Sequence, residues 1–183
     1  MQEGDFLFNI DSYYIKELNE QKHNEELQIL CEACSDYYEL CEERSVSPTA
    51  SKDLFINVPP SKKLEDKRIL GIYEGRNESK NLVGVLDMLI DFPNENTWYI
   101  GLFMIKPSIR NNKLGERVLH QYKEWALRNG VKELNIGVLE ENEKAFRFWS
   151  RMGFEVVKKI DNFEIGNKVA TVFSMKYEFL DKI

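Results

Sequence analysis

Apolar positions repeat with two different periods along the second half of the chain, and the change of period predicts a strand followed by a helix. Residues 98–105, WYIGLFMI, are apolar at nearly every position, which is typical of a central strand covered on both faces. Pro107 ends this strand, because proline cannot donate to a strand ladder. Residues 114–126 then carry apolar side chains every three or four positions, and Asn129 and Gly130 form a helix stop.

The alternation of strand and helix continues to the end of the chain. We expect a strand at residues 134–139, followed by a helix that Asn142 caps and Gly153 ends. Two closing strands are expected at residues 154–157 and 168–179. The inward stripe of the second helix contains Ala145, Phe148, Trp149 and Met152.

In the first half, we predict a short leader, a strand at residues 13–18, and a helix over residues 25–43 with Asn24 as its cap. Three cysteines share an apolar stripe of this helix with leucines, and the two histidines provide no matching pair for zinc. We therefore interpret the cysteines as reduced, buried side chains and expect no metal site. These residues are Cys31, Cys34 and Cys41, with His23 and His120.

Between this helix and the central strand, the pattern predicts an irregular segment and then a hairpin. Residues 45–60 contain three prolines and one expected short helix at residues 50–56, a composition typical of a mobile or substrate-facing segment. Strands at residues 68–73 and 82–90 follow, joined by a polar turn at residues 74–81.

Two carboxylates interrupt the second strand of this hairpin. By two-residue alternation, Asp87 and Asp91 share a face with Val83, Val85 and Leu89. Buried carboxylates without partners are costly, so two interpretations stay open. Either Asp91 lies at a solvated strand end and Asp87 caps a neighbouring element, or Asp87 faces a polar cavity.

Composition narrows the range of partners. The 183 residues carry a net charge of −6 with scattered Lys and Arg, which argues against nucleic acid and suits a cationic substrate. No apolar run approaches the roughly 18–20 residues that cross a bilayer, and the N-terminus shows no secretory signal. We therefore expect one domain over residues 1–183 of a cytoplasmic protein, with no membrane partner.

The turn between the central strand and the first long helix predicts an anion site. Such a turn aims successive backbone N–H groups and the positive end of the helix at one place. Arg110 and Lys113 add positive charge at its rim, and Gly115 opens the helix. On its own this pattern is common among proteins.

Two sequence blocks together resemble the GNAT superfamily of acyl-CoA-dependent N-acyltransferases. Residues 105–115, IKPSIRNNKLG, are similar to the family's Gln/Arg-x-x-Gly-x-Gly/Ala loop, with Lys113 where the middle glycine is usual. Residues 142–154, NEKAFRFWSRMGF, are similar to its Asn-x-x-Ala-x-x-x-Tyr-x-x-x-Gly-Phe block, with Trp149 in the tyrosine position. The resemblance is strongest over about residues 98–157.

The resemblance implies a mixed, mostly antiparallel sheet flanked by helices, whose central strands splay apart around the pantetheine arm of acetyl-CoA. The diphosphate would bind amides of the loop. A residue turning into a helix needs no positive φ, so Lys113 is expected to be tolerated there. The implied cofactor-binding residues are Phe103, Met104, Ile105, Arg110, Asn111, Asn112, Lys113, Leu114, Gly115 and Asn142.

The implied reaction is direct attack of a primary amine on the thioester in a ternary complex. The amine must lose a proton, and the candidate bases are Asp87, Glu140 and, after them, Asp91. Glu140 has the alternative of being a solvated loop acid. Trp149 is expected to pack beside Phe148 and to line the thioester end, although indole cannot protonate a thiolate.

Three other functions stay open. A catalytically silent acyl-CoA-binding or sensory module is the main one, because Trp149 replaces tyrosine and no base is decisive. A nucleotide-binding enzyme is disfavoured by the absence of a Gly-Lys-Ser/Thr motif. A protein-interaction domain is the third. The acceptor would be a small-molecule or peptide amine, and a homodimer stays open as an assembly.

Overall fold

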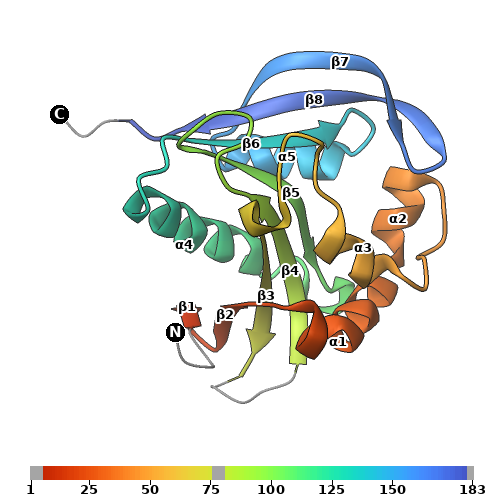
Figure 1. Ribbon diagram of the computed structural model, residues 1–183, viewed down its shortest axis with the longest axis vertical. Coiled ribbons are helices and arrows are strands. Elements are labelled where there is room, and N and C mark those ends of the chain that lie inside the picture. Colours follow the sequence, from red (N-terminus) through yellow and green to blue (C-terminus); the bar gives the residue numbers. More distant parts are fainter. Residues whose placement is uncertain (1–5, 76–80, 181–183) are drawn as a thin grey trace.

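A computed structural model describes residues 6–75 and 81–180, and these residues form a twisted sheet of eight strands (Figure 1). The strand order is β1-β2-β3-β4-β5-β6-β8-β7. Among these strands, β5 and β6 are the one parallel pair of neighbours. The fold class predicted from the sequence is therefore confirmed. The strands are β1 (Phe6–Ile10), β2 (Tyr13–Glu17), β3 (Lys67–Glu74), β4 (Asn81–Leu89), β5 (Thr97–Ile105), β6 (Glu133–Leu139), β7 (Glu155–Ile165) and β8 (Lys168–Glu178).

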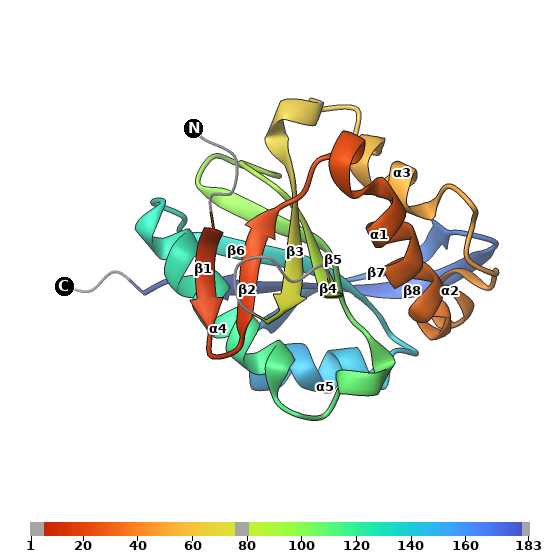
Figure 2. The ribbon, with the colours of Figure 1, turned by 90° about the horizontal axis from the view of Figure 1, so that it is seen from below.

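Helices cover both faces of this sheet (Figure 2). One face carries α1 (Glu20–Ala33), α2 (Ser35–Glu42) and α3 (Ala50–Ile56), and the other carries α4 (Leu114–Arg128) and α5 (Glu143–Arg151). Two short 3-10 helices, η1 (Leu64–Asp66) and η2 (Pro107–Ile109), precede β3 and α4. Within the described part of the chain, none of the helices has the length and apolar composition needed to span a bilayer.

The alternation of side chains along β4 supplies both halves of the core. Leu86 and Met88 pack with Tyr122 of α4 in the core of one face. Val85 packs with Leu27 of α1 in the core of the other. Because β4 is buried on both faces, its one carboxylate, Asp87, is confined between the sheet and the helices α1–α3, as described below.

Most predicted elements of the first half are confirmed, including the helix at residues 50–56 and the hairpin of β3 and β4. Within the expected polar turn, residues 76–80 lie outside the described residues. The expectation of a short leader before the first strand is wrong in part, because β1 pairs antiparallel with β2 at the edge of the sheet. Asp11, with φ of 52°, makes the tight turn between them.

The long helix expected over residues 25–43 is two helices, and its predicted cap is wrong. Asn19 caps α1 by accepting a hydrogen bond from the Lys22 backbone N–H at 3.0 Å. Asn24 lies inside α1 and accepts a hydrogen bond from the Ser51 hydroxyl at 2.8 Å. The helix breaks at Cys34, and Cys41 of α2 packs against Leu139 of β6 and Val172 of β8.

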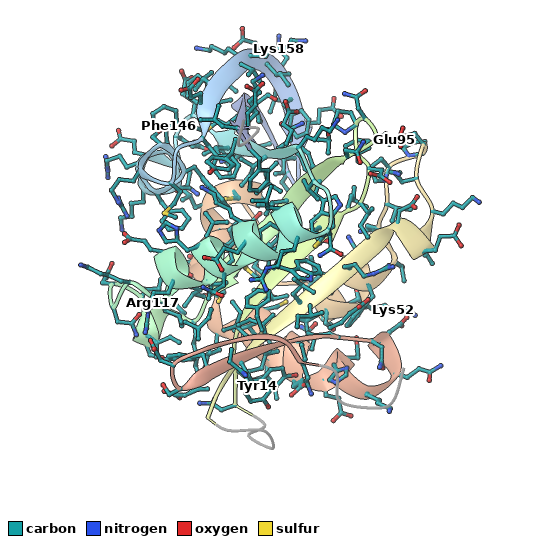
Figure 3. All side chains as sticks on the ribbon, turned by 90° about the vertical axis from the view of Figure 1, so that its left-hand side faces the viewer. Tyr14, Lys52, Glu95, Arg117, Phe146 and Lys158 are labelled. Atoms are coloured by element: carbon teal, nitrogen blue, oxygen red, sulfur yellow. The ribbon has the colours of Figure 1, made fainter. Side chains whose placement is uncertain are left out.

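A buried lysine joins the two helices of the opposite face. Figure 3 shows α4 lying across the strands, with Arg117 near its N-terminal end. Lys123, further along α4, donates to the carbonyl of Met152, which closes α5, and its ammonium lies 3.5 Å from the centre of the Tyr177 ring. Burial lowers the pKa of Lys123 to about 8.

The lowered pKa makes the contribution of Lys123 to stability depend on pH. The ordinary lysine pKa is 10.5. Between pH 8 and 10.5 the folded state releases the Lys123 proton while the unfolded state keeps it. We therefore expect the free energy of unfolding to rise with pH through this window, relative to that of Lys123→Met. Denaturant titrations across this range test the difference, and exposed Lys158→Met is the control that should show none.

Candidate active site

The parallel pair at the centre of the sheet separates part-way along its length. Residues Thr97–Ile100 of β5 pair with Glu133–Ile136 of β6, and the pairing stops there. β5 stays paired with β4 as far as Ile105, and β6 stays paired with β8 as far as Leu139. The expected splay of the central strands is thus present, as a gap between two strand ends that each remain in the sheet.

One aromatic side chain occupies the point where the strands part. The Tyr99 hydroxyl lies so close to Gly137 that a side chain added there would begin 3.0 Å from it. Glycine at position 137 therefore leaves room for the Tyr99 hydroxyl where β5 and β6 separate. Beyond this point the backbone of β5 faces the gap without a strand partner.

Some backbone N–H and C=O groups of β5 point into the gap, where a ligand could bond to them. Lys106 points its N–H at Val83 of β4. Because hydrogen-bonding direction alternates along a strand, the backbone groups of Phe103 and Ile105 point away from β4, into the gap. The Ile105 carbonyl accepts a hydrogen bond from Arg110 at 2.6 Å, so the backbone of Phe103 remains for a ligand.

A groove of about 700 Å³ opens from this gap and runs along the start of α4 and the face of α5. Every residue expected to bind the cofactor lines it, which brings together residues of β5, of α4, of the turn between them and of the cap of α5. They are Phe103, Met104, Ile105, Arg110, Asn111, Asn112, Lys113, Leu114, Gly115 and Asn142. Residues of α2 that sequence analysis did not select, Asp36, Tyr37 and Leu40, also line it.

The turn before α4 is tight, and two of its residues have left-handed backbone. Asn111 has φ of 66° and Lys113 has φ of 63°. The expectation that position 113 needs no positive φ is therefore wrong, because the chain reverses there before the helix begins at Leu114. The side chain of Asn112 accepts a hydrogen bond from the Leu114 N–H at 2.9 Å. Gly115 and Glu116 of the first turn line the groove, and the first amides of a helix have no partner within it.

Arg110 lines the groove, but its charge is paired with another side chain. Its guanidinium makes a two-pronged ion pair with Asp36 at the start of α2. These bonds lower the pKa of Asp36 below its ordinary range. Arg110 thus ties the end of β5 to α2, while Lys113 and Lys144 line the groove without an ion pair to another described residue.

Trp149 is buried within an aromatic cluster at the inner end of the groove. Only 4% of it is exposed, and its ring centre lies 5.2 Å from that of Phe148 and 5.0 Å from that of Phe154. Phe103 of β5 lies 6.1 Å away across the gap. Trp149 therefore packs beside Phe148 and also lines the groove.

A second cavity, of about 220 Å³, lies beneath α2 and α3 and has Asp87 in its wall. Asp87 is 8% exposed, and the Lys67 ammonium lies 2.9 Å from each of its carboxylate oxygens. Lys67 hydrogen-bonds to Oδ2 and to the Asn57 carbonyl, and Oδ1 has no hydrogen-bond partner among the described residues. Burial raises the pKa of Asp87, and Lys67 opposes this rise.

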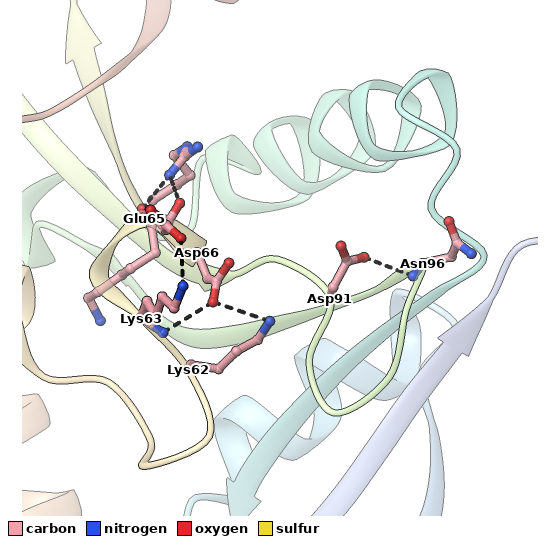
Figure 4. A network of polar contacts seen from close by, with 8 residues as sticks. Lys62, Lys63, Glu65, Asp66, Asp91 and Asn96 are labelled. Carbon is pink, nitrogen blue, oxygen red and sulfur yellow. Dashed lines mark hydrogen bonds and ion pairs between the residues drawn. The ribbon is translucent and has the colours of Figure 1, made fainter.

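The other two candidate bases lie away from both cavities. Glu140 is on the surface, with its carboxylate 2.9 Å from the Lys159 ammonium. Asp91 lies in the turn between β4 and β5, where it accepts a hydrogen bond from the Asn96 backbone N–H at 2.8 Å (Figure 4). Of the three expected catalytic residues, Trp149 lines the groove, Asp87 lines the second cavity, and Glu140 lines neither.

Lys67 and the α2 residues of the groove, Tyr37 among them, are the site residues that sequence analysis missed. Lys67 reaches Asp87 diagonally across the β3–β4 ladder, two residues from the Ile69 that pairs with Asp87. A lysine at the start of the strand next to a buried Asp was a usable signal. Tyr37 lies off the apolar stripe of its helix, and nothing in the sequence pattern marks it.

Comparisons with known proteins agree with this geometry. The sequence model described as the acetyltransferase (GNAT) family matches residues 27–154, which is most of the chain. The chain belongs to the GNAT acetyltransferase family. A comparison with curated protein sequences finds no match.

Several solved GNAT structures share the fold at low identity. An acetyltransferase from Thermus thermophilus has 19% identity and a TM-score of 0.72, covering 92% of this chain and 97% of that one. A spermidine N-acetyltransferase from Vibrio cholerae, in complex with CoA and spermine, has 14% identity and a TM-score of 0.69, covering 92% and 96%. A ribosomal-protein-S5-alanine acetyltransferase from Vibrio fischeri has 11% identity and a TM-score of 0.70, covering 95% and 97%. The two Vibrio enzymes are named for different acceptors, so this fold does not determine the acceptor.

The left-handed backbone at Lys113 gives a stability prediction. A non-glycine residue with this φ costs about 1 kcal/mol or more, and glycine loses about 0.5–1 kcal/mol in chain entropy. We expect Lys113→Gly to unfold at equal or higher denaturant concentration than the native protein, and Lys113→Ala to give no gain. Chemical denaturation measures both variants. A Lys113→Gly variant much less stable than Lys113→Ala would contradict the strained turn.

Proposed function

We propose that this protein transfers an acetyl group from acetyl-CoA to a primary amine within a ternary complex. The observation that carries the proposal is that the groove and the smaller cavity share a wall formed by β5 and α2. Phe103 lines the groove, the adjacent Leu102 lines the smaller cavity, and Tyr37 of α2 lines both. A thioester in the groove and an amine in the cavity would therefore be neighbours.

The residues of the groove fit the parts of acetyl-CoA, which supplies the activated acetyl thioester. The gap beside Phe103 offers unpaired strand backbone to the amides of a pantetheine arm. The amides at the start of α4, with Lys113 and Lys144 near them, suit the phosphate groups. Arg110 would hold the turn in shape through Ile105 and Asp36 rather than bind phosphate with its side chain.

Asp87 is the group that supports proton removal from the amine. Its Oδ1 is buried and forms an ion pair with Lys67 at 2.9 Å but makes no hydrogen bond to a described residue, and an ammonium in the cavity would supply one. The raised pKa of Asp87 makes it a better proton acceptor than an ordinary aspartate. Gly101 of β5 leaves room for this carboxylate, since an added side chain would begin 3.1 Å from Oδ2.

The departure of the thiolate does not use Trp149 as an acid. Indole has an N–H donor but no proton that it gives up at neutral pH. A thiol with a pKa of about 8.5 is already a fair leaving group, so acetyl transfer stays feasible at this site. Trp149 would shape the inner end of the groove and exclude water from the thioester.

Trp149 also favours the second candidate function, a silent module that binds acyl-CoA without transferring the acyl group. The two functions separate in one experiment, in which thiol release is measured with acetyl-CoA and a broad panel of amines. Turnover supports the enzyme, and tight acetyl-CoA binding without any turnover supports the silent module. The panel should include small-molecule and peptide amines, because both suit the acidic balance of the chain. Its buried, reduced cysteines support a cytoplasmic location.

The proposed base gives a prediction with a matched control. Asp87→Asn should lower kcat by about 100-fold or more while leaving acetyl-CoA affinity unchanged, because the groove is untouched. Glu140→Gln should keep the full rate, since Glu140 is paired on the surface. Steady-state kinetics and calorimetric titration measure the two effects. Equal rates for all three proteins would show that the proton leaves by another route.

The pH dependence of the rate tests the same assignment without removing the carboxylate. As the base, Asp87 must be ionised, so kcat/KM should fall as the pH drops through its raised pKa. Lys67→Met removes the ion pair that lowers this pKa, so it should move the acidic limb to higher pH. Asp87→Asn leaves the Lys67 charge buried without its partner, which can destabilise the fold. The double variant Asp87→Asn/Lys67→Met removes both charges, so a low rate in a stably folded double variant reports lost catalysis.

A further inference from the structure

Acetyl transfer to an amine leaves one charge that none of the assigned residues stabilises. The amine nitrogen forms a bond to the carbonyl carbon, its excess proton goes to Asp87, and the carbon–sulfur bond breaks. The electron pair of that bond leaves with sulfur as a thiolate. A thiolate released against the aromatic cluster of Trp149, Phe148 and Phe103 would lie in apolar surroundings, where an unpartnered charge is costly.

We propose that the hydroxyl of Tyr37 donates a hydrogen bond to the departing thiolate and that Tyr37 is thus a catalytic residue. The inference rests on the proposed acetyl transfer. Among the described residues that line the groove, Tyr37 is the one with a side-chain hydroxyl. No hydrogen bond to another described residue is found for this hydroxyl, so its donor is available to a ligand.

The place of Tyr37 between the cavities fits the position of the sulfur. Tyr37 lines the groove on one side and the smaller cavity on the other. The bond that breaks lies between the thiol arm in the groove and the acetyl carbon that faces the amine. A donor in the shared wall is therefore beside the bond that breaks, whereas Lys113 and Lys144 lie with the phosphate end.

The surroundings of Tyr37 keep its hydroxyl protonated, so that it can donate a hydrogen bond. Its pKa is raised far above the ordinary range by burial, and further by Cys41, Glu42, Asp87 and Tyr99. The phenol therefore stays neutral at working pH and keeps its proton. In this role it stabilises the thiolate without giving up the proton, and solvent protonates the sulfur after release.

The helix that carries Tyr37 is held at both ends, which fixes the hydroxyl relative to the groove. Asp36 pairs with Arg110 at the start of α2. At the other end, Asn167 of the β7–β8 turn donates its backbone N–H to the Glu42 carbonyl at 2.9 Å, and Gly166 packs directly against Glu42. In Figure 1 this turn reaches across to α2. A donor held in place before the reaction costs little reorganisation in the transition state.

The direct test is the pKa of the CoA thiol bound to the protein, followed by the ultraviolet absorbance of the thiolate. Free thiols titrate near a pKa of about 8.5. With the native protein we expect the pKa of the bound thiol to lie at least about one unit lower, because the donor favours the thiolate. Tyr37→Phe should return it to the value of the free thiol while CoA affinity at low pH is unchanged.

Three comparison variants sharpen this result. Tyr38→Phe removes a hydroxyl from the next position of the same helix, and Tyr38 lines only the smaller cavity, so the bound thiol should keep its lowered pKa. Trp149→Phe removes the indole N–H donor of the aromatic cluster, and Arg151→Met removes the guanidinium that lies over the Phe148 ring. If either of these two variants abolishes the shift and Tyr37→Phe does not, that side chain is the donor and the inference is overturned.

Kinetics provide the second measurement. Tyr37→Phe should lower kcat by roughly 10- to 100-fold, the value of one hydrogen bond to a charged group, with the KM for acetyl-CoA unchanged. An unchanged thiol pKa and an unchanged kcat would overturn the inference about Tyr37 alone. A protein that binds no CoA would overturn the proposed function, and the inference with it.

Discussion

The separation of β5 from β6 is the constraint on which the rest of this structure depends. Two neighbouring strands that stop pairing leave backbone groups without partners, and buried groups of this kind need a replacement. Arg110 satisfies the Ile105 carbonyl, and the Tyr99 hydroxyl lies against Gly137 where the strands separate. The backbone of Phe103 keeps its groups facing the gap, where a ligand would supply the missing partners.

The helix α2 lies between the groove at this gap and the smaller cavity, and it lines both. It is joined to the β5 side through Asp36 and Arg110, and to the β6–β8 side through the packing of Cys41 on Leu139 and Val172. The groove therefore lies on one side of α2 and β5, and the cavity of Asp87 on the other. A single side chain of α2, Tyr37, belongs to both walls. In the proposed function, this arrangement would place the thioester and the amine on two sides of one shared wall.

The elements that could be predicted from the sequence are those whose signals are local. The central strand, the helix that follows and the turn between them have strong patterns, and all ten residues expected around the cofactor line one groove. The position of β1 was missed because its pairing depends on a turn at Asp11 rather than on a clear alternation. The cap was placed at Asn24, whereas Asn19 caps α1 directly after the buried Leu18, and the side chain of Asn24 instead bonds to Ser51 of α3.

The parts of the site that could not be predicted depend on contacts between distant segments. Asp87 was visible as a carboxylate on an apolar strand, but its partner Lys67 becomes clear only from the register of β3 and β4. Arg110 was expected to add positive charge at the rim of the anion site, and its ion pair with Asp36, which is 74 residues away along the chain, could not be predicted. The strain at Lys113 follows from how sharply the turn closes, which the order of residues does not specify.

The central claim is that the gap between β5 and β6, with the start of α4, holds CoA. Backbone amide hydrogen exchange with and without CoA measures this claim residue by residue. We expect exchange to slow at Phe103, where the gap opens, and at Lys113 and Gly115, where the phosphates would bind, with no change along β1 and β2. Slowing confined to other segments, with Phe103 and the start of α4 unchanged, would contradict it.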